Sequence, residues 1–497
     1  MTTTAADGPR VYSLGQTTHR SLLGRREPGE VVVLCLGIAT GVLFAIASGG
    51  QPIGFVLLAA SILTALTVVF VPLRGRTLYR WLPLDVRHAR KKRAGTLSYR
   101  SGSYEAGFLL DGTPVDVPPP SPVGPVKWMS IPFRGEPLAV LLSQTDGALT
   151  ATIEVEGPGH GLFDGPELEA SHARWGSLLR ELANSEGFLD RVAQITRTSP
   201  SRSSSHAAWV DGRPDAGIPT ELIQSYEDLQ VRVTTSTDSH RNYVVARMGA
   251  GEARAKAVKL AGGGDAGLCA LMVREVEALA DRLEDAGFRV VSGLDAAATA
   301  ELIRSTYDPD IAADRSPGSA GITLLPRDAW PRHSHAGREH LEADGWFHAT
   351  AAVRWPTVGV GVGFLTPLLV QCPGIVRTVC VVTELIPTDV AMREALSDLT
   401  HETAERRRSE KAGEVDDPRR LVQAGTMNQR AADVAQGAAG ARIVAYVSVS
   451  ATSSDALEGA KRRVRTAAAR AWLALEWCDK EHDRAIVNVL PLGRGLR

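Results

Sequence analysis

A stretch of 43 residues, Val31–Leu73, contains no Asp, Glu, Lys, Arg or His. A helix that crosses the roughly 30 Å hydrocarbon core of a bilayer needs about 20 mostly apolar residues. The stretch is long enough for two such helices, and Gly49-Gly50-Gln51-Pro52 supplies a turn rich in helix-breaking residues. We therefore expect a transmembrane hairpin with helices at about Val31–Ser48 and Ile53–Val71.

Two other interpretations of this stretch fit less well. A signal peptide has an apolar core of about 7–15 residues followed by a small-residue cleavage site. The stretch is longer than that, begins after residue 30 and repeats its apolar pattern at once. A core helix of a soluble protein would carry several polar residues along its outer face. The membrane hairpin remains the expected structure.

Basic residues flank the uncharged stretch on both sides. They are Arg20, Arg25 and Arg26 before it, and Arg74, Arg76, Arg80, Arg87, Arg90, Lys91, Lys92 and Arg93 after it. Asp85 is the only acid within the second group, and the turn between the helices has no charge. The positive-inside rule therefore predicts a multi-pass protein of the cell membrane with both termini in the cytoplasm. The run Arg87–Arg93 also suits anionic lipid headgroups, and this interpretation stays open beside a plain topology signal.

The composition excludes some classes of protein. Lys plus Arg number 55 and Asp plus Glu 56, so the chain lacks the dominant positive field of a protein that wraps nucleic acid. With 44% hydrophobic residues and a net charge of -1, bulk disorder is also excluded. The five cysteines are scattered without C-x-x-C spacing, which argues against a disulfide framework or a zinc ribbon and fits a reducing compartment.

Beyond a proline-rich connector at residues 118–125, strand-like and helix-like patterns alternate. Strands are expected at Leu138–Leu142, Leu149–Glu156, Leu229–Thr235, Asn242–Met248, Phe288–Ser292, His348–Arg354, Arg377–Leu385, Ala441–Ser450 and Ile486–Leu490. Helices are expected at Glu167–Thr196, after Gly262–Gly264, and at Asp295–Tyr307, Asp389–Ala412, Pro418–Gln436 and Ser454–Asp479. This alternation favours an α+β fold: the two-helix hairpin is followed by cytoplasmic α/β layers with mixed or antiparallel sheets. No repeat of fixed period is visible.

The same patterns predict a division of the chain into six parts. These are a cytoplasmic N-terminal segment (1–30), the transmembrane hairpin (31–73), a basic juxtamembrane and proline-rich connector (74–130), a cytoplasmic α+β domain (131–310), an irregular segment with strands (311–376) and a C-terminal α+β domain with long helices (377–497). At roughly 100–200 residues per domain, the length allows such a division.

Three short motifs of phosphate binding and catalysis bear on whether the chain is an enzyme. The string G-x-x-x-x-G-K-[ST] of a phosphate-binding loop is absent, as are G-x-S-x-G and H-E-x-x-H. Gly262-Gly263-Gly264-Asp265 is better interpreted as a linker that ends in an Asp N-cap than as a phosphate site. We therefore nominate no catalytic and no cofactor-binding residues, and expect a protein that is not an enzyme.

The densest histidine group comprises His333, His335 and His340. Arg332 and Arg338 lie beside it and would disfavour a bound cation, so a polar loop or an interface is favoured over a zinc site. No metal ligands are nominated.

Three large aromatic residues, Trp346, Phe347 and Trp355, lie near a turn in an unusually charged segment. Such residues anchor protein interfaces, but they also cover hydrophobic cores. We treat them as candidates for a partner interface, with the core as the alternative.

Five segments resemble an actinobacterial family of integral membrane proteins linked to type IV secretion and conjugation. They are Val71–Arg76 after the hairpin, Arg241–Met248, Arg338–Ala349, Arg377–Pro387 and Leu490–Leu496. The resemblance runs over nearly the whole chain. Its first part is similar to the small two-helix PrgI-type membrane subunit of conjugation machines. Its soluble part looks like the N-terminal, non-motor domain of a conjugation ATPase.

This resemblance implies a membrane-anchored, non-catalytic scaffold that docks a separate hexameric ATPase at the cytoplasmic membrane face. The bilayer, that ATPase, other translocon subunits and further copies of the chain are the implied partners, and contact with nucleic acid stays undecided. The family pattern carries no catalytic residues, which agrees with the missing phosphate-binding loop. Two alternatives stay open: a type VII secretion component with two N-terminal spans, and a membrane-bound enzyme such as a glycosyltransferase.

Overall fold

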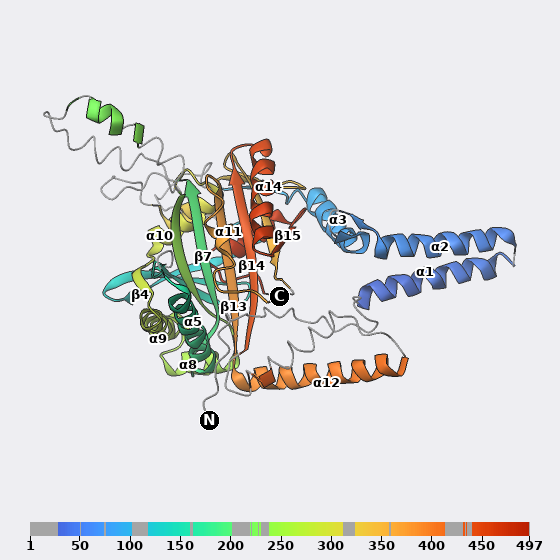
Figure 1. The fold of residues 1–497 in the computed structure, drawn as a ribbon, viewed down its shortest axis with the longest axis horizontal. Coiled ribbons are helices and arrows are strands. Elements are labelled where there is room, and N and C mark those ends of the chain that lie inside the picture. The colour runs from blue at the N-terminus through green and yellow to red at the C-terminus, as the bar shows by residue number, and fades with distance from the viewer. Residues whose placement is uncertain are drawn as a thin grey trace. The chain divides into compact units, whose positions relative to one another are not determined.

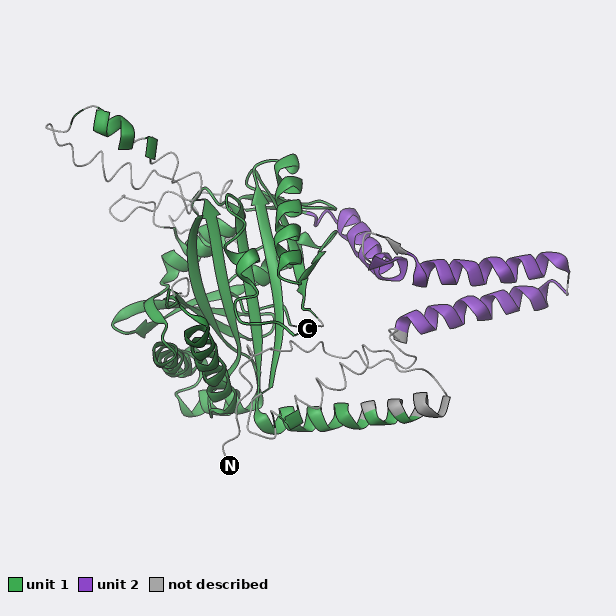
Figure 2. Cartoon of the chain, viewed as in Figure 1, with its two compact units in different colours: residues 1–15, 98–497 green, residues 16–97 purple. Residues whose placement is uncertain are grey.

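The computed structural model describes residues 28–49, 51–73, 76–101, 118–159, 163–200, 219, 221–226, 228–229, 238–311, 324–356, 359–412, 431–432, 434 and 440–496. These residues divide into two compact units, one within residues 16–97 and one within residues 98–497 (Figure 2). We call the first the helical unit and the second the body.

The helical unit contains two long apolar helices and a shorter third helix. Its elements are α1 (Pro28–Ala47), α2 (Pro52–Phe70), β1 (Pro72–Leu73), β2 (Arg76–Thr77) and α3 (Leu78–Arg93) (Figure 1). Both α1 and α2 are long and apolar enough to cross a membrane, and their bounds lie close to those of the predicted hairpin. The sequence analysis does not predict α3, because Pro83 and a run of consecutive basic residues obscure its helical periodicity.

The body alternates strands and helices along nearly its whole length. Its first half contains β3 (Ser98–Arg100), β4 (Val126–Phe133), β5 (Glu136–Ser143), β6 (Leu149–Glu156), α5 (Gly165–Asn184), β7 (Leu189–Pro200), β8 (Asp238–Met248), α8 (Glu252–Leu260), α9 (Gly264–Asp285), β9 (Arg289–Gly293) and α10 (Ala296–Tyr307). Its second half contains η3 (Pro326–Ala329), β10 (His333–Ala336), β11 (Leu341–Ala343), β12 (Trp346–Arg354), α11 (Thr366–Leu369), β13 (Val376–Ile386), α12 (Thr388–Ala412), β14 (Gly440–Ala451), α14 (Ser454–Arg470), β15 (Ala474–Trp477), α15 (His482–Ala485) and η4 (Ile486–Val489).

Thirteen of these strands form one sheet. Its order is β3-β10-β11-β12-β14-β13-β7-β8-β6-β5-β4, with β15 added to β12 and β9 added to β6. Every neighbouring pair is antiparallel. The fold is therefore α+β with an antiparallel sheet, which is one of the two arrangements that the sequence predicts.

Eight of the thirteen strands belong to two copies of one topology. In the first copy, β6-α5-β7-β8-α9-β9 forms strands in the order β9-β6-β8-β7. In the second copy, β12-α11-β13-β14-α14-β15 forms strands in the order β15-β12-β14-β13. This is the ferredoxin-like β-α-β-β-α-β arrangement. We call the two copies the first and the second repeat, and they meet where β7 pairs with β13.

The strand registers identify equivalent residues in the two repeats. Ala151 and Thr152 of β6 correspond to Ala349 and Thr350 of β12, and Tyr243 and Val244 of β8 correspond to Tyr446 and Val447 of β14. The same equivalence extends to the backbone: the Leu294 amide donates to the Thr152 carbonyl at 3.0 Å, and the Cys478 amide donates to the Thr350 carbonyl at 2.9 Å. The match covers identical side chains at only a few positions, which is why the sequence shows no visible repeat.

The repeats are related by an approximate two-fold axis that passes through the pair of Ile195 and Cys380. In this pair a residue lies opposite its own equivalent in an antiparallel ladder. An axis perpendicular to the sheet at that point exchanges the repeats and keeps each side chain on the same face. As a result, α5, α9, α11 and α14 all cover one face, over cores that contain Val192 in the first repeat and Val379 in the second. On the other face, Tyr446 donates to the Gly495 carbonyl of the C-terminal segment.

Two predicted helices extend too far in the sequence analysis. The helix expected over Glu167–Thr196 ends at Asn184, and its last part is strand β7. The helix expected over Ser454–Asp479 ends at Arg470, because Trp472 has a left-handed backbone with φ 58°. In both cases apolar residues continue at helical spacing by coincidence, since an alternating strand also places some of them three or four positions apart.

Three further expectations differ from the structure. The final strand expected at Ile486–Leu490 is the 3-10 helix η4. The region 308–345 is not wholly irregular, because it holds the β10–β11 hairpin. Strand β4 begins in the segment assigned to the proline-rich connector and ends in the α+β domain expected after it. The elements expected at Leu229–Thr235 and Pro418–Gln436 lie almost entirely outside the described residues.

The division expected within residues 131–497 does not coincide with the compact units. Strands from the ranges 131–310, 311–376 and 377–497 all belong to the one sheet of the body. The reason is that β14 inserts between β12 and β13, which joins segments from different ranges by backbone hydrogen bonds. Sequence patterns report elements but not which distant strands become neighbours.

Candidate functional site

Small residues allow the two apolar helices to approach closely. A Cβ atom on Gly37 would lie 2.4 Å from the Cβ of Ala65, and one on Gly41 would lie 2.7 Å from a methyl group of Leu58. The hydroxyl of Ser61 donates to the Gly37 carbonyl at 2.6 Å. Gly37 and Gly41 form a G-x-x-x-G pattern, which suits close helix packing in an apolar environment. The pattern here holds α1 and α2 together within one chain.

The outward surface of these helices is apolar. Only 11% of the most apolar 18-residue stretch of α1, and 17% of that of α2, is buried inside the structure. Large side chains that are more than half exposed are Val32, Leu36, Leu43, Ile46, Ile53, Phe55, Val56, Leu63 and Phe70. Contiguous apolar surface of this kind marks a site of contact with a membrane or another protein. A core helix of a soluble protein would instead be mostly buried.

The third helix, α3, is amphipathic and contacts α2. Trp81 and Leu84 are buried within the helical unit, and the guanidinium of Arg76 lies over the Trp81 ring at 5.6 Å from its centroid. Leu82 and Val86 point outward, with 63% and 42% of their surface exposed. A helix with exposed apolar residues and many cations is typical of one that lies in the interfacial layer of a membrane.

The predicted lipid-headgroup residues concentrate on and beside this helix. Arg74 lies outside the described residues. Those on or near α3 are Arg76, Arg80 and Lys91, which are half-buried, and Arg87, Arg90, Lys92 and Arg93, which are exposed. Asp85 is the one acid on α3. The helix therefore carries a strong positive charge directly after the second apolar helix, as the sequence indicates.

The structure places Trp346 in the core rather than on the surface. Only 7% of its surface is exposed, and its indole Nε1 donates to Asp310 at 3.0 Å. Phe347 is half-buried, and its ring meets the edge of the His340 ring at 5.1 Å between centroids. Trp346 is therefore a core residue, and Phe347 lies at the border of the hydrophobic core.

Trp355 also contributes to packing. Its indole Nε1 donates to the Ile443 carbonyl at 3.0 Å, and its ring lies 6.4 Å from that of Phe364. The side chain is half-buried against the core of the second repeat. A shared exposed patch is therefore not formed by Trp346, Phe347 and Trp355. In the sequence, an aromatic residue at an interface cannot be told from one in the core.

The histidine group lies at one edge of the sheet. His333 and His335 are exposed on β10, and Nδ1 of His335 lies 2.9 Å from the Ser98 hydroxyl of β3. His340 is half-buried and follows the strand. Among the residues that the structure describes, no group of three His, Cys, Asp or Glu side chains is placed to hold a metal ion.

The glycine-rich loop before α9 has a different cap from the one predicted. Gly262, Gly263 and Gly264 all have positive φ, and Gly263 is the N-cap without a side-chain bond. Asp265 lies in the first turn, where its carboxylate pairs with Lys127 of β4 at 2.5 Å. The expected Asp N-cap is therefore wrong, because Asp265 is held by the neighbouring strand instead.

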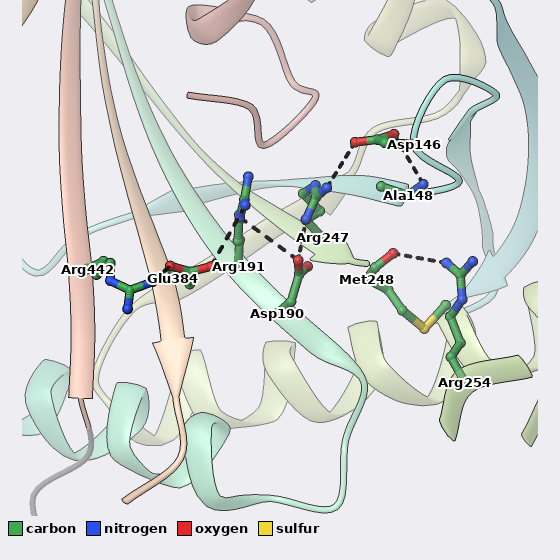
Figure 3. Close-up of polar contacts among 9 residues, drawn as sticks. All are labelled: Asp146, Ala148, Asp190, Arg191, Arg247, Met248, Arg254, Glu384 and Arg442. Atoms are coloured by element: carbon green, nitrogen blue, oxygen red, sulfur yellow. Dashed lines mark hydrogen bonds and ion pairs between the residues drawn. The ribbon is translucent and has the colours of Figure 1, made fainter. Parts of the chain in front are cut away.

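A cluster of arginines and acids lies where β7, β8 and the β5–β6 turn meet (Figure 3). Arg247 of β8 is almost fully buried and pairs with Asp146 at 3.0 Å and with Asp190. Arg191 lies 3.9 Å from Asp190 and 3.8 Å from Glu384 of β13. The chain of ion pairs therefore runs from the first repeat to the second. Sequence reasoning missed it because its members are far apart along the chain.

The charges of this cluster are held ionised. Burial alone would raise the pKa of the Asp146 carboxyl, but hydrogen bonds from Ser143 and Arg247 hold it below its usual value. Burial lowers the pKa of Arg191, and repulsion from Arg247 lowers it further. Arginine nevertheless stays protonated in proteins. The ion pairs of the cluster connect β7 and β8 to the β5–β6 turn and to β13.

The C-terminal segment, which contains Gly493 and Arg494, packs against this cluster. Arg494 donates to the Pro122 carbonyl at 3.1 Å and to the Ser143 hydroxyl at 3.0 Å. A Cβ atom on Gly493 would lie 2.9 Å from the Arg247 side chain, and Gly493 has a left-handed backbone with φ 55°. The glycine therefore lets the segment pass over the buried arginine.

Comparison with known proteins gives no name to this arrangement. No protein-family model matches the chain, and no curated protein matches it in sequence. The interpretation of the site rests on the residues themselves.

Proposed function

We propose that the chain is a membrane-anchored, non-catalytic scaffold of a type IV secretion-like or conjugative translocation apparatus. In this proposal it docks a separate hexameric ATPase at the cytoplasmic face of the membrane. The observation that carries the proposal is the apolar outer surface of α1 and α2, which lipid would cover. The resemblance of five segments to a secretion-linked family supports the kind of apparatus, and the body supplies a large folded surface for partners.

The placement of charge supports the membrane part of this proposal. The basic residues of α3 follow the second apolar helix directly, and Leu82 and Val86 are exposed beside them. In an interfacial helix such side chains enter the bilayer while the cations meet anionic headgroups. Each basic residue near an anionic leaflet contributes about 1 kcal/mol of attraction. The body then lies on the cytoplasmic side together with α3.

Membrane insertion and orientation are tested first, on the full chain. We expect the protein to stay with membranes after washing at high pH, and a C-terminal fluorescent reporter to be active in the cytoplasm. Replacing Arg87, Arg90, Lys91, Lys92 and Arg93 by Glu removes five of the eleven flanking cations and should lower the fraction with a cytoplasmic reporter. A control of the same size replaces five exposed cations of the body, Arg174, Lys256, Lys259, Arg338 and Arg407, by Glu. Release of the wild-type chain by the wash would contradict the membrane anchor.

The partner is tested by purification from the native host in a mild detergent. We expect a hexameric ATPase of the translocation type to co-purify, identified by mass spectrometry. Co-purification of type VII secretion components would move the chain to that apparatus. Turnover of a nucleotide or sugar donor by the isolated chain would contradict a non-catalytic role.

A further inference from the structure

Two helices at equivalent positions of the repeats carry opposite charge. The first-repeat helix α9 has Asp265, Glu275, Glu277, Asp281, Glu284 and Asp285 against Arg274 and Arg282. The second-repeat helix α14 has Lys461, Arg462, Arg463, Arg465 and Arg470 against Asp455 and Glu458. Because the repeats share one topology, the fold does not require this difference. The opposite charges of the two helices therefore need an explanation other than the topology.

The equivalence of the two helices is fixed by how they end. The Phe288 amide donates to the Leu283 carbonyl after α9, and the Leu473 amide donates to the Ala468 carbonyl after α14, both at 2.9 Å. Aligning these bonds pairs residues along the helices. Glu277 then corresponds to Arg462 and Asp285 to Arg470, so acids stand where the other repeat has arginines.

The opposed charges lie on exposed stripes. Glu277, Asp281 and Asp285 are exposed and four positions apart, so they share one side of α9. On α14, Arg462, Arg465 and Arg470 are exposed and lie within about 140° of one another around the helix, a broader band than that of the acids on α9. We call these the acidic stripe and the basic stripe. Arg134 pairs with Asp281 at 3.2 Å, which offsets only part of the acidic stripe.

The two stripes belong to opposite ends of one face of the body. The helix α9 packs over β4, β6, β8 and β9, whereas α14 packs over β12, β14 and β15 (Figure 1). The junction of β7 and β13 lies between these sets of strands. Both helices cover the same sheet face, so the stripes of one chain point to the same side of the sheet but stand apart along it.

We propose that the basic stripe of one copy docks on the acidic stripe of a second copy of this chain. The contact joins two different surfaces, so it is head-to-tail, and each added copy leaves one stripe of each kind at the ends. Such contacts close into a ring or grow into a line. Trp472 stands beside the basic stripe with 71% of its surface exposed, and an exposed tryptophan is a common anchor of interfaces. The proposal does not depend on the function proposed above.

Charge complementarity of this kind makes association depend on salt. Exposed charges interact over a Debye length of about 14 Å at 50 mM salt and about 4 Å at 500 mM. We therefore expect the full chain in a non-ionic detergent to show concentration-dependent growth in mass at about 50 mM salt, and to dissociate at about 500 mM. Mass photometry or light scattering coupled to size exclusion measures this directly.

Two matched variants test the residues. The first is the triple variant Arg462→Glu, Arg465→Glu and Arg470→Glu, which makes both stripes acidic. The second is the triple variant Glu277→Lys, Asp281→Lys and Asp285→Lys, which makes both stripes basic. Each variant alone should associate at least about tenfold more weakly than the wild type, because like charges then face each other. A mixture of the two variants should associate again, because each now complements the other.

The mixture separates the proposal from simple misfolding, since a misfolded variant cannot restore association. Circular dichroism of each variant checks the fold independently. Wild-type chain that stays monomeric at low salt and high concentration would overturn the proposal. The proposal would also be overturned if either triple variant alone associated as strongly as the wild type. It would be overturned again if the two variants were folded but did not associate when mixed, and the stripes would then belong to a contact with a different partner.

Discussion

The two repeats of the body have the same strand order and different residues. Leu279 in α9 and Val464 in α14 are equivalent and fully buried, so the interior keeps its apolar character. On the surface, Glu277 corresponds to Arg462, and the charge is reversed. At this interior position both repeats therefore keep an apolar residue, while the charges on their surfaces differ. The surface of each repeat is free to take a separate task.

Some buried positions also differ between the repeats. Val192 of β7 corresponds to Arg377 of β13, and Thr150 of β6 corresponds to His348 of β12, although all four are buried. A buried ionic or titratable side chain needs partners that an apolar one does not. At these positions the second repeat carries side chains that need polar partners, namely Asp238 of β8 in the first repeat for Arg377 and the Tyr307 carbonyl of α10 for His348. The two positions offer ways to test the comparison.

The largest expected effect is at Arg377. Its guanidinium is fully buried, pairs with Asp238 at 3.2 Å and donates to the carbonyls of Cys372 and Leu369. Replacing it by Ala leaves a buried carboxylate without its partner, so Arg377→Ala should lower the free energy of unfolding by about 3–5 kcal/mol. Thermal unfolding of the purified full chain, followed by circular dichroism, measures the change.

Controls for this variant come from both repeats. The equivalent change Val192→Ala removes apolar volume only and should cost less than Arg377→Ala. Adding Asp238→Ala to Arg377→Ala should recover part of the loss, because the uncompensated charge is gone. If Val192→Ala proved as costly as Arg377→Ala, the polar contacts would not distinguish the repeats.

The second effect concerns acid stability and His348. Its Nε2 lies 2.9 Å from the Tyr307 carbonyl, which can only accept, so Nε2 carries the proton and Nδ1 accepts from the Ser450 hydroxyl at 2.8 Å. Burial lowers the pKa of His348 to about 4. The folded state thus holds a neutral imidazole where the first repeat has Thr150.

This lowered pKa has a definite consequence for stability. An unfolded histidine has a pKa of about 6.5, so the unfolded state binds a proton as the pH falls below that value while the folded state does not. Stability is therefore full above about pH 6.5 and falls between about pH 6.5 and 4, by about 3 kcal/mol in total. In His348→Asn this part of the pH dependence should vanish. A variant with an unchanged acid limb would show that another group causes it.

The smallest effect concerns the turns that end the two helices. Trp472 has φ 58°, and the equivalent residue after α9 is Gly287 with φ 90°. A left-handed backbone strains a residue with a Cβ atom by about 1 kcal/mol but costs glycine little. We expect Trp472→Gly to raise the free energy of unfolding by up to about 1 kcal/mol and Gly287→Ala to lower it by a similar amount. Equal effects of the same sign would show that the turns are not equivalent.

Local signals made parts of the fold predictable. The uncharged stretch predicts two apolar helices because lipid-sized helices need such length, and Asp146-Gly147 predicts the β5–β6 hairpin because this pair suits its turn. The ends of α5 and α14 were placed wrongly because apolar spacing continued past them. The pairing of β12 with β14 could not be predicted, since about 90 residues separate them in the chain and periodicity carries no information on partners.

The candidate sites show the same limit. The basic residues of α3 were found because consecutive cations after an apolar helix are a local signal. The choice between core and interface for Trp346 depended on Asp310, a distant partner that no pattern near Trp346 reveals. The opposed stripes were missed because they acquire meaning only when α9 and α14 are known to be equivalent.

The late position of β14 in the chain sets an order of events during synthesis. This strand fills the gap between β12 and β13, so the sheet cannot close until residues 440–451 have left the ribosome. The hairpin α1–α2 ends at residue 70, and at a ribosomal speed of about 5–20 residues per second it emerges roughly 20 to 70 s earlier. The two apolar helices therefore leave the ribosome while the sheet is still an intermediate with open edges.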